Sequence, residues 1–194
     1  MAFDPISYAL AKKAEADAQT GITNANNALS LAEWGDILAM NPSPNLLTLN
    51  QAECTNALNN TTGFGGGGGG TSTLSSSTVN PLPGQTKSLN VLCTTGVDRE
   101  GATTNVTTVV NGTVYTIYAN VIAPVDATMQ MWWSSNGIVS TSNFIGTGQQ
   151  QIVSCGGAAG TTTGAIYAML LNTQSAFAGK SFQIRGLILR QGSS

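Results

Sequence analysis

The sequence predicts a mainly β protein, in which a short N-terminal helical anchor is followed by an antiparallel β-sandwich of the jelly-roll type. Two observations predict this class. Residues 1–60 are rich in alanine and leucine, whereas residues 61–194 are rich in threonine, valine, isoleucine and glycine, which favour strands and turns. In the second part, short apolar runs alternate with turn signals and no helical stretch lies between them. The 194 residues suffice for one ordinary domain and a smaller appendage.

The first helix is expected from Pro5 to about Gln19. Asp4 can cap the free amide groups of its first turn, and a proline at the first helical position loses no hydrogen bond. Gly21 is well placed to end this helix. A second helix is expected from about Asn24 to Met40, because two prolines follow shortly afterwards.

The third helix is expected to begin after Thr48, which forms a Thr-x-x-Gln capping box with Gln51, and to run to about Leu58. Helices this short are marginal alone in water. We therefore expect all three to dock on the rest of the chain or on a partner.

Six consecutive glycines, Gly65–Gly70, mark the clearest boundary. Ordering such a run is entropically costly, which predicts a flexible linker over 63–72. The expected domains are thus a helical attachment region over 1–62 and a β-sandwich over 73–194. Glycine packed at the crowded axis of an oligomer is the alternative. A phosphate-binding loop is disfavoured, because neither nucleotide-binding glycine motif is present.

Eight strands are expected in the second part. They are Ser88–Thr94, Thr103–Val110, Thr113–Ile122, Thr128–Trp133, Ile138–Phe144, Gln149–Cys155, Ala165–Leu171 and Ser181–Arg190. Asn111-Gly112 predicts a type I′ hairpin between two of them, and residues 134–137 supply a second turn. Alternation along the last strand places Phe182, Ile184, Gly186 and Ile188 on one face. Tyr115, Ile117, Ala119 and Val121 share a face in the same way.

The composition excludes several classes of function. Only 8% of residues are charged, the formal net charge is −2, and there is no histidine. Without histidine, the Ser-His and Cys-His nucleophile pairs and His-ligated zinc are absent, and without a basic excess nucleic-acid binding loses its main energetic contribution. We expect no catalytic residues, no metal, no cofactor and no nucleic acid as a partner. A calcium ion is the alternative to the absence of metal, since aspartate and backbone carbonyls suffice as its ligands, although the sequence has no Asp-x-Asp-x-Asp-Gly loop. No apolar run reaches the length of about 20 residues that a membrane span needs, so no membrane insertion is expected.

The three cysteines, Cys54, Cys93 and Cys155, have no Cys-x-x-Cys spacing. We expect three small buried side chains. A bridge between Cys93 and Cys155 is the remote alternative, since both lie in expected strands.

Trp132 and Trp133 are adjacent in an expected strand, so their rings point to opposite faces of the sheet. One can enter the core, while the other can offer a platform for the apolar face of a sugar ring. Burial of the second tryptophan by a loop or another subunit is the alternative. The acids Asp98 and Glu100 are too close in sequence for a glycosidase pair and are expected in a solvated loop.

The N-terminus, Met-Ala-Phe-Asp-Pro-Ile-Ser-Tyr-Ala-Leu-Ala-Lys-Lys-Ala, resembles the start of fibre and head-fibre proteins of tailed bacteriophages. The part from about Thr71 resembles jelly-roll modules of the carbohydrate-binding type that recur in viral decoration, fibre and spike proteins. This resemblance implies attachment to the virion by a segment that contains Asp4, Ile6, Tyr8, Leu10, Lys12 and Lys13. The simpler interpretation of the two lysines is that they lie on the solvated face of the first helix and pair with Glu15 or Asp17.

The expected function is that of a structural virion protein that decorates the capsid through its N-terminal helices and displays the β-sandwich outward. The implied partners are the major capsid protein or another virion protein, further copies of the chain in a homotrimer, and a host cell-surface glycan. A tail-fibre or adhesin-type receptor-binding protein is the alternative. The absence of an extended repeat shaft weakens the tail-fibre version.

Overall fold

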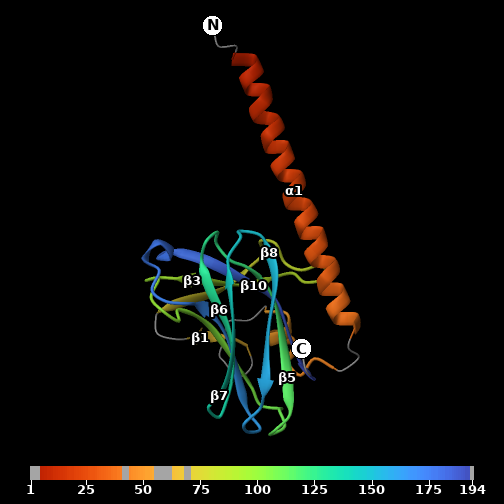
Figure 1. Cartoon of the computed structure of the whole chain (residues 1–194), viewed down its shortest axis with the longest axis vertical. Helices are drawn as coiled ribbons and strands as arrows, with labels where there is room; N and C mark the ends of the chain where they lie inside the picture. The colour runs from red at the N-terminus through yellow and green to blue at the C-terminus, as the bar shows by residue number, and fades with distance from the viewer. Residues whose placement is uncertain (1–4, 41–43, 55–62, 68–70, 193–194) are drawn as a thin grey trace.

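The computed structural model describes residues 5–40, 44–54, 63–67 and 71–192. Its body is a sandwich of two five-stranded antiparallel sheets (Figure 1). Sheet A has the order β1 (Gly65–Gly67), β4 (Gly101–Val106), β9 (Gly164–Leu170), β6 (Thr128–Ser135) and β7 (Ile138–Ile145). Sheet B has the order β2 (Ser72–Ser77), β3 (Ser88–Cys93), β10 (Lys180–Gln191), β5 (Val114–Ile122) and β8 (Gln150–Ala158). A single 3₁₀ turn, η1 (Ser175–Phe177), precedes β10. The predicted mainly β sandwich and all eight predicted strands are confirmed.

The core lies between the inner faces of the two sheets, and every second residue of β6 is buried. Trp133 of β6 is fully buried, and its ring lies 6.2 Å from that of Tyr115 in β5. Cys54, Cys93 and Cys155 are free thiols inside this core. Burial raises the pKa of the Cys93 thiol, and likewise that of Cys155, to about 12. The predicted burial of the cysteines is therefore confirmed, and the alternative bridge is not formed.

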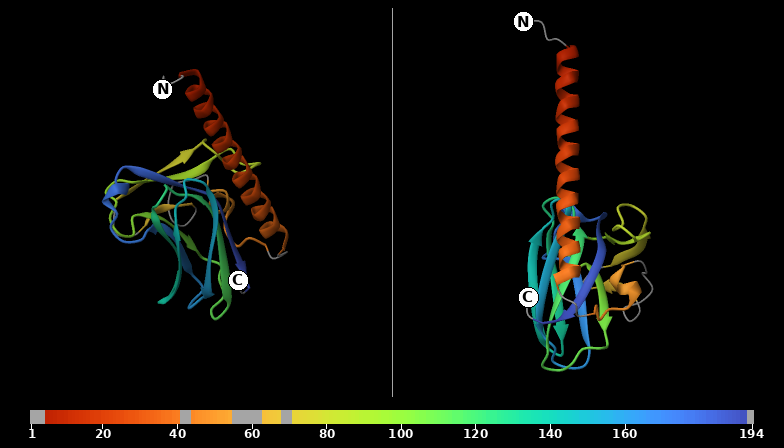
Figure 2. Two further views of the ribbon diagram at one scale, coloured as in Figure 1. Left: turned by 45° about the horizontal axis from the view of Figure 1, so that its top comes forward. Right: turned by 90° about the vertical axis from the view of Figure 1, so that its right-hand side faces the viewer.

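The N-terminal helix differs from its prediction. One helix, α1 (Pro5–Met40), replaces the two that were expected, and neither Gly21 nor Gly35 interrupts it. A single glycine costs a helix interior about 1 kcal/mol, and the alanine-rich turns on both sides of each glycine favour continuation. Two further views show its N-terminal part projecting beyond the sandwich (Figure 2). Among the described helices, none combines the length and the apolar character that crossing a bilayer requires.

The segment from 44 to 54 belongs to the sandwich. Helix α2 (Leu49–Ala52) has the predicted capping box, in which the Thr48 side chain accepts from the amide of Gln51. The buried Gln51 side chain then donates to Thr104 Oγ1 and to the carbonyl of Asn105, both at 2.7 Å. The helix is shorter than predicted, because Cys54 adopts a left-handed conformation. The rest of the predicted helix, 55–58, lies outside the described residues.

The glycine run also differs from its prediction as a linker. Gly65–Gly67 forms β1, which pairs with the first residues of β4. Glycine favours this close pairing, because a Cβ on Gly67 would lie 3.0 Å from the backbone of Ala102, closer than ordinary van der Waals contact. Residues 68–70 are outside the described part of the chain. The division into three domains stays a prediction.

The predicted hairpin at Asn111-Gly112 is wrong. A turn is present, but it connects β4 of sheet A with β5 of sheet B, and only Gly112 has a positive φ of 79°. A type I′ turn needs a positive φ at both central residues. That pattern occurs instead at Asn136 and Gly137, which join β6 to β7.

The face assignment of the last strand also needs correction. The register between β10 and β5 shifts between Ile184 and Gly186, which leaves Arg185 as an extra residue. Phe182 and Ile184 therefore lie in the main core, whereas Ile188 belongs to a separate cluster with Trp34 of α1. The predicted face of Tyr115, Ile117, Ala119 and Val121 is buried throughout, as expected.

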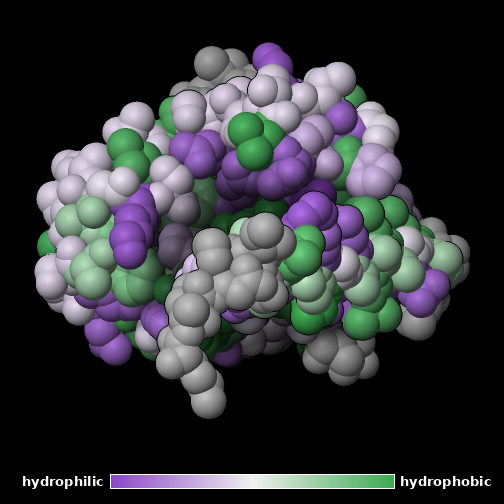
Figure 3. Space-filling model, turned by 90° about the horizontal axis from the view of Figure 1, so that it is seen from above, coloured by the Kyte–Doolittle hydropathy of each residue, from purple (hydrophilic) through white to green (hydrophobic). Residues whose placement is uncertain are grey.

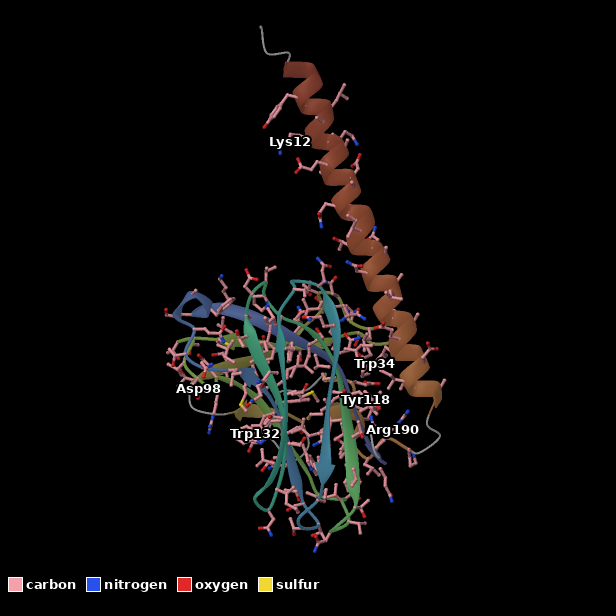
Figure 4. The ribbon with its side chains drawn as sticks, in the orientation of Figure 1. Lys12, Trp34, Asp98, Tyr118, Trp132 and Arg190 are labelled. Carbon is pink, nitrogen blue, oxygen red and sulfur yellow. The ribbon has the colours of Figure 1, made fainter. Side chains whose placement is uncertain are left out.

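Helix α1 docks on the outer face of sheet B through its C-terminal part. Trp34 packs against Leu82 and Ile188, and Gly186 provides the space, since a Cβ there would lie 2.8 Å from the indole. The guanidinium of Arg190 donates to the carbonyls of Ile37 and Leu38. A cation at the C-terminal carbonyls of a helix also complements its dipole. Figure 4 shows Trp34, Tyr118 and Arg190 gathered beside this part of the helix.

Substitution of Gly186 by valine should release the C-terminal part of α1 while the sandwich stays folded. The added side chain would occupy the place of the Trp34 ring, so the peptide bond after the neighbouring Glu33 should become accessible. We expect cleavage there by a glutamate-specific protease to become about tenfold faster, because the exposed population rises by that factor for a loss of about 1.4 kcal/mol.

Gly35→Ala is the matched control, because a Cβ at Gly35 meets no atom within 4 Å. It should leave the cleavage rate unchanged or slower. Equal cleavage of Gly186→Val and the unsubstituted protein would mean that Trp34 does not hold the helix.

Candidate functional site

The candidate site is the outer face of sheet A around Trp132. In β6, Trp132 is half-buried and points away from the core, whereas Trp133 is buried within it. Their predicted opposite orientation is confirmed. Trp132 lies opposite Tyr167 of the neighbouring strand β9, and the centres of the two rings are 5.5 Å apart at an interplanar angle of 42°. The sheet therefore presents a pair of neighbouring aromatic rings on its outer face.

A cation lies against this aromatic pair. The guanidinium carbon of Arg99 is 5.2 Å from the centre of the Trp132 ring, within the range of a cation–π interaction. Arg99 lies in the β3–β4 loop and has a φ of 63°. The loop is held by Asp98, whose carboxylate accepts from the amide of Asn172 at 2.6 Å. Arg99 is thus presented to the indole from a tethered loop.

Glu100 is the residue that folds this loop. Its fully buried carboxylate accepts from the hydroxyls of Thr94 and Thr95, both at 3.0 Å, from their backbone amides and from the amide of Gly96 at 2.6 Å. Burial raises the pKa of Glu100, but the hydrogen bonds from the two threonines outweigh burial and hold the pKa below its usual value. The expectation of a solvated acidic loop is therefore wrong for Glu100, whose carboxylate is engaged in holding the loop.

Polar groups extend the aromatic pair along the sheet. Toward one end, Gln130 donates from Nε2 to Asn143 Oδ1 at 2.8 Å. Toward the other end lies a hollow of about 400 Å³, lined among others by Asn105, Ser134 and Asn136. Between them, the Trp132 indole nitrogen is buried and has no hydrogen-bond partner among the described residues.

Thr103, which pairs with Tyr167 on the same face, also has a buried hydroxyl without a partner in the described part of the chain. Buried polar atoms normally have a hydrogen-bond partner. Thr103 and Trp132 flank Tyr167 on this face, from β4 and from β6 respectively, and neither of these two polar atoms is paired within the described residues.

Four of the predicted attachment residues, Tyr8, Leu10, Lys12 and Lys13, lie on the projecting part of α1, away from this face. All residues from 8 to 22 of this helix are exposed. Lys12 pairs with Glu15 at 2.7 Å and Lys13 pairs with Asp17 at 2.6 Å, which agrees with the simpler interpretation that the two lysines lie on a solvated face of the helix. Tyr8 and Leu10 are 52% and 63% exposed.

Asp4 and Ile6 are the other two predicted attachment residues. Asp4 lies outside the described residues, and Ile6 belongs to α1 without a described side chain. Within the described ranges, no three side chains of the metal-ligating types histidine, cysteine, aspartate and glutamate come together.

Sequence reasoning found Trp132 but missed Tyr167, Arg99 and the role of Glu100. Tyr167 could have been found from the alternation of the strand that contains it. The approach of Arg99 could not, because it depends on a left-handed residue in a loop whose path is set by the buried carboxylate.

No family model and no curated protein matches the chain, but its fold is similar to several solved structures. The CBM22-1 xylan-binding domain of Xyn10C from Paenibacillus barcinonensis has a TM-score of 0.58 and 12% identity, and the match covers 78% of this chain and 97% of that domain. TmCBM61, solved in complex with β-1,4-galactotriose, has a TM-score of 0.54 and 12% identity, with coverages of 77% and 100%.

A third match is the enzymatically active domain of tailspike protein 4 of bacteriophage CBA120, with a TM-score of 0.58 and 11% identity. It covers 76% of this chain but only 21% of the tailspike chain. At these identities the similarity concerns the fold alone. The chain is a jelly-roll sandwich of the kind found in carbohydrate-binding modules.

Replacing Glu100 by glutamine should destabilise the fold at neutral pH by about 1–3 kcal/mol, because an amide cannot accept with both of its terminal atoms. Glu100 has a lowered pKa in the folded state, so its contribution is present above the unfolded pKa and is lost as the pH falls through the folded value. Urea unfolding should therefore show a large difference at pH 7 that shrinks in strong acid.

The exposed Glu33 provides the control, since Glu33→Gln should leave the unfolding midpoint unchanged at both pH values. A Glu100→Gln protein as stable as the unsubstituted protein at pH 7 would contradict the structural role of this carboxylate.

Proposed function

We propose that this chain is a non-catalytic glycan-binding structural protein of a tailed bacteriophage, which decorates the capsid through its N-terminal helix and displays the sandwich outward. The observation that carries the proposal is the placement of α1 and of Trp132 on different sheets (Figure 4). A helix docked on sheet B leaves the outer face of sheet A uncovered by the helix. The N-terminal resemblance to phage fibre and head-fibre proteins supports the particle as that attachment point.

Glycan binding at sheet A is supported by its chemistry. Aromatic rings pack on the apolar faces of sugars, and amides and hydroxyls bind sugar hydroxyls. Trp132 and Tyr167 supply the first kind of group, and Gln130 and Asn105 supply the second. Arg99 covers part of the indole, so a sugar ring that stacks there displaces its guanidinium. The xylan-binding and galactotriose-bound modules of similar fold support the same ligand class.

Attachment and self-association are assigned to the projecting part of α1. Small residues recur along one exposed face at alternating spacings of four and three, a heptad pattern that brings helices close together. These residues are Ala11, Ala14, Ala18, Gly21, Ala25, Ala28, Ala32 and Gly35. Larger apolar side chains flank this face and are more than half exposed, namely Leu10, Ile22 and Leu29. Contact with α1 of other copies in a homotrimer, and with the capsid, would bury them.

A tail-fibre or adhesin-type receptor-binding protein is the second candidate, supported by the fold similarity to a phage tailspike domain. The two candidates predict different positions on the particle. Labelled protein distributed over the capsid shell supports decoration, whereas a single polar spot supports the tail-fibre alternative.

Trp132→Ala should weaken binding of a β-1,4-linked oligosaccharide, with xylohexaose and galactotriose as the first probes, at least about tenfold. The reason is the loss of the ring on which the sugar stacks, since tenfold corresponds to about 1.4 kcal/mol. Titration calorimetry on the full chain measures the change, after a glycan array has identified the best ligand.

Trp133→Phe is the matched control, because Trp133 faces the core and not the site. It should lower the unfolding temperature and leave the affinity within about twofold of the original value. If Trp132→Ala kept its affinity, or if the unsubstituted protein bound no glycan on the array, the proposed glycan site at Trp132 would be wrong.

Ala18→Glu should shift the protein from a trimer to a monomer in solution, because a carboxylate would be buried at the seam between helices at a cost of several kcal/mol. Mass determination by light scattering or ultracentrifugation measures the state. The same variant should no longer associate with phage particles if capsid contact requires the assembled helices.

Ala16→Glu places the same change two residues away, outside the heptad face, and should leave the mass unaltered. A monomeric unsubstituted protein, or equal masses for all three proteins, would show that α1 does not mediate self-association.

A further inference from the structure

The bulge in β10 gives Arg185 an unusual environment. As the extra residue of the strand, Arg185 points out of sheet B together with Gly186 and beneath helix α1. The residue is only 5% exposed. Its guanidinium donates to Gln150 Oε1 and, at 3.2 Å, to the carbonyl of Pro81. A bulge is a recurrent way to aim a side chain that the regular alternation of a strand would direct elsewhere.

The charge of Arg185 has no counterion in the described part of the chain. Its hydrogen-bond acceptors, Gln150 Oε1 and the Pro81 carbonyl, are neutral oxygens, no described carboxylate forms an ion pair with it, and its Nε atom is buried without a partner among the described residues. Burial lowers the pKa of its guanidinium. An uncompensated buried charge costs several kcal/mol, so a bound anion would remove a penalty that the fold otherwise carries.

A hollow large enough for such an anion lies directly beside Arg185. It has a volume of about 490 Å³ and separates α1 from sheet B. Besides Arg185, its lining includes the polar side chains of Thr23 and Asn24 from α1, and of Asn80, Gln149 and Gln150 from the sandwich. Figure 3 shows hydrophilic residues around the hollowed surface beside the helix, seen from its N-terminal end.

We propose that this hollow is a second binding site, which takes an acidic sugar with its carboxylate on Arg185. A guanidinium pairs with a carboxylate through two parallel N–H groups, and each terminal nitrogen of Arg185 has one N–H group beyond the bonds given above. One buried positive charge balances one carboxylate, whereas a phosphate would add further negative charge. The surrounding amides and hydroxyl are suited to the hydroxyl groups of a sugar.

This inference does not depend on the site at Trp132, because the two sites lie on different sheets and are formed by different residues. It also gives α1 a second role. Thr23 and Asn24 form one wall of the hollow, so an occupied site would add contacts between the helix and the sandwich.

Titration of the full chain with D-glucuronate, D-glucose and inorganic phosphate tests the proposal. We expect glucuronate to bind at least about tenfold more tightly than either of the other two compounds. The NMR signal of the Arg185 Nε–H group should move on addition of glucuronate. Arg185→Met should weaken glucuronate binding at least about tenfold, and Arg185→Lys, which keeps the charge without the fork, should have intermediate affinity.

Arg99→Met removes the cation beside Trp132 and should leave glucuronate binding within about twofold of the original. Absence of glucuronate binding, or equal binding to Arg185→Met, would overturn the proposal, and so would phosphate binding that matches or exceeds glucuronate. Should Arg185→Met fail to fold, the proposal is tested by the glucuronate affinity of Arg185→Lys and by the shift of the Arg185 Nε–H signal. Unchanged affinity together with an unmoved signal would overturn it. Failure of this site leaves xylohexaose binding and its Trp132→Ala loss unaffected, so the two functions fail separately.

Discussion

The outer face of sheet B is organised by one extra residue in its central strand. Strand β10 contributes Phe182 and Ile184 to the core before the bulge and Leu187 and Leu189 after it. Without the bulge, strict alternation would direct one of these pairs to the opposite face. The extra residue keeps both pairs in the core. It also directs Gly186, Ile188 and Arg190 to the outer face of the sheet, where they contact α1.

These three residues together hold the C-terminal part of α1. Gly186 gives Trp34 its space, Ile188 extends the apolar contact, and Arg190 binds the terminal carbonyls of the helix. Each contact alone is modest, but all three lie on one strand and fix the same part of one helix. This is why the C-terminal part of α1 is held, whereas the side chains from 8 to 22 remain exposed.

Much of the sandwich follows from local sequence patterns. The eight predicted strands and the Thr48 capping box depend on alternation and side-chain chemistry within a few residues, and they are found as predicted. The errors concern distant contacts. No residue near Asn111 indicates that the next strand, β5, belongs to the other sheet. Strand β1 forms through its pairing with β4, which a run of glycines without side chains can approach closely.

The candidate site divides in the same way. The opposite directions of Trp132 and Trp133 follow from strand geometry alone. Arg99 reaches the indole only because Glu100 is buried among the amides and hydroxyls of Thr94 and Thr95. A buried carboxylate and an exposed one look identical in a sequence, so the solvated loop was the reasonable expectation and the wrong one.

A module with shallow, half-exposed binding groups gains most from being present in many copies. An open sheet face with two aromatic rings buries less of a ligand than an enclosed pocket does, which limits the affinity of one copy. In the proposed assembly, linking copies through α1 would convert each further contact into an intramolecular one, and avidity would then exceed single-site affinity by orders of magnitude. On that proposal the projecting helix and the open sheet would compensate for each other, because partners would bury the apolar face of the helix and neighbouring sheets would together hold a glycan.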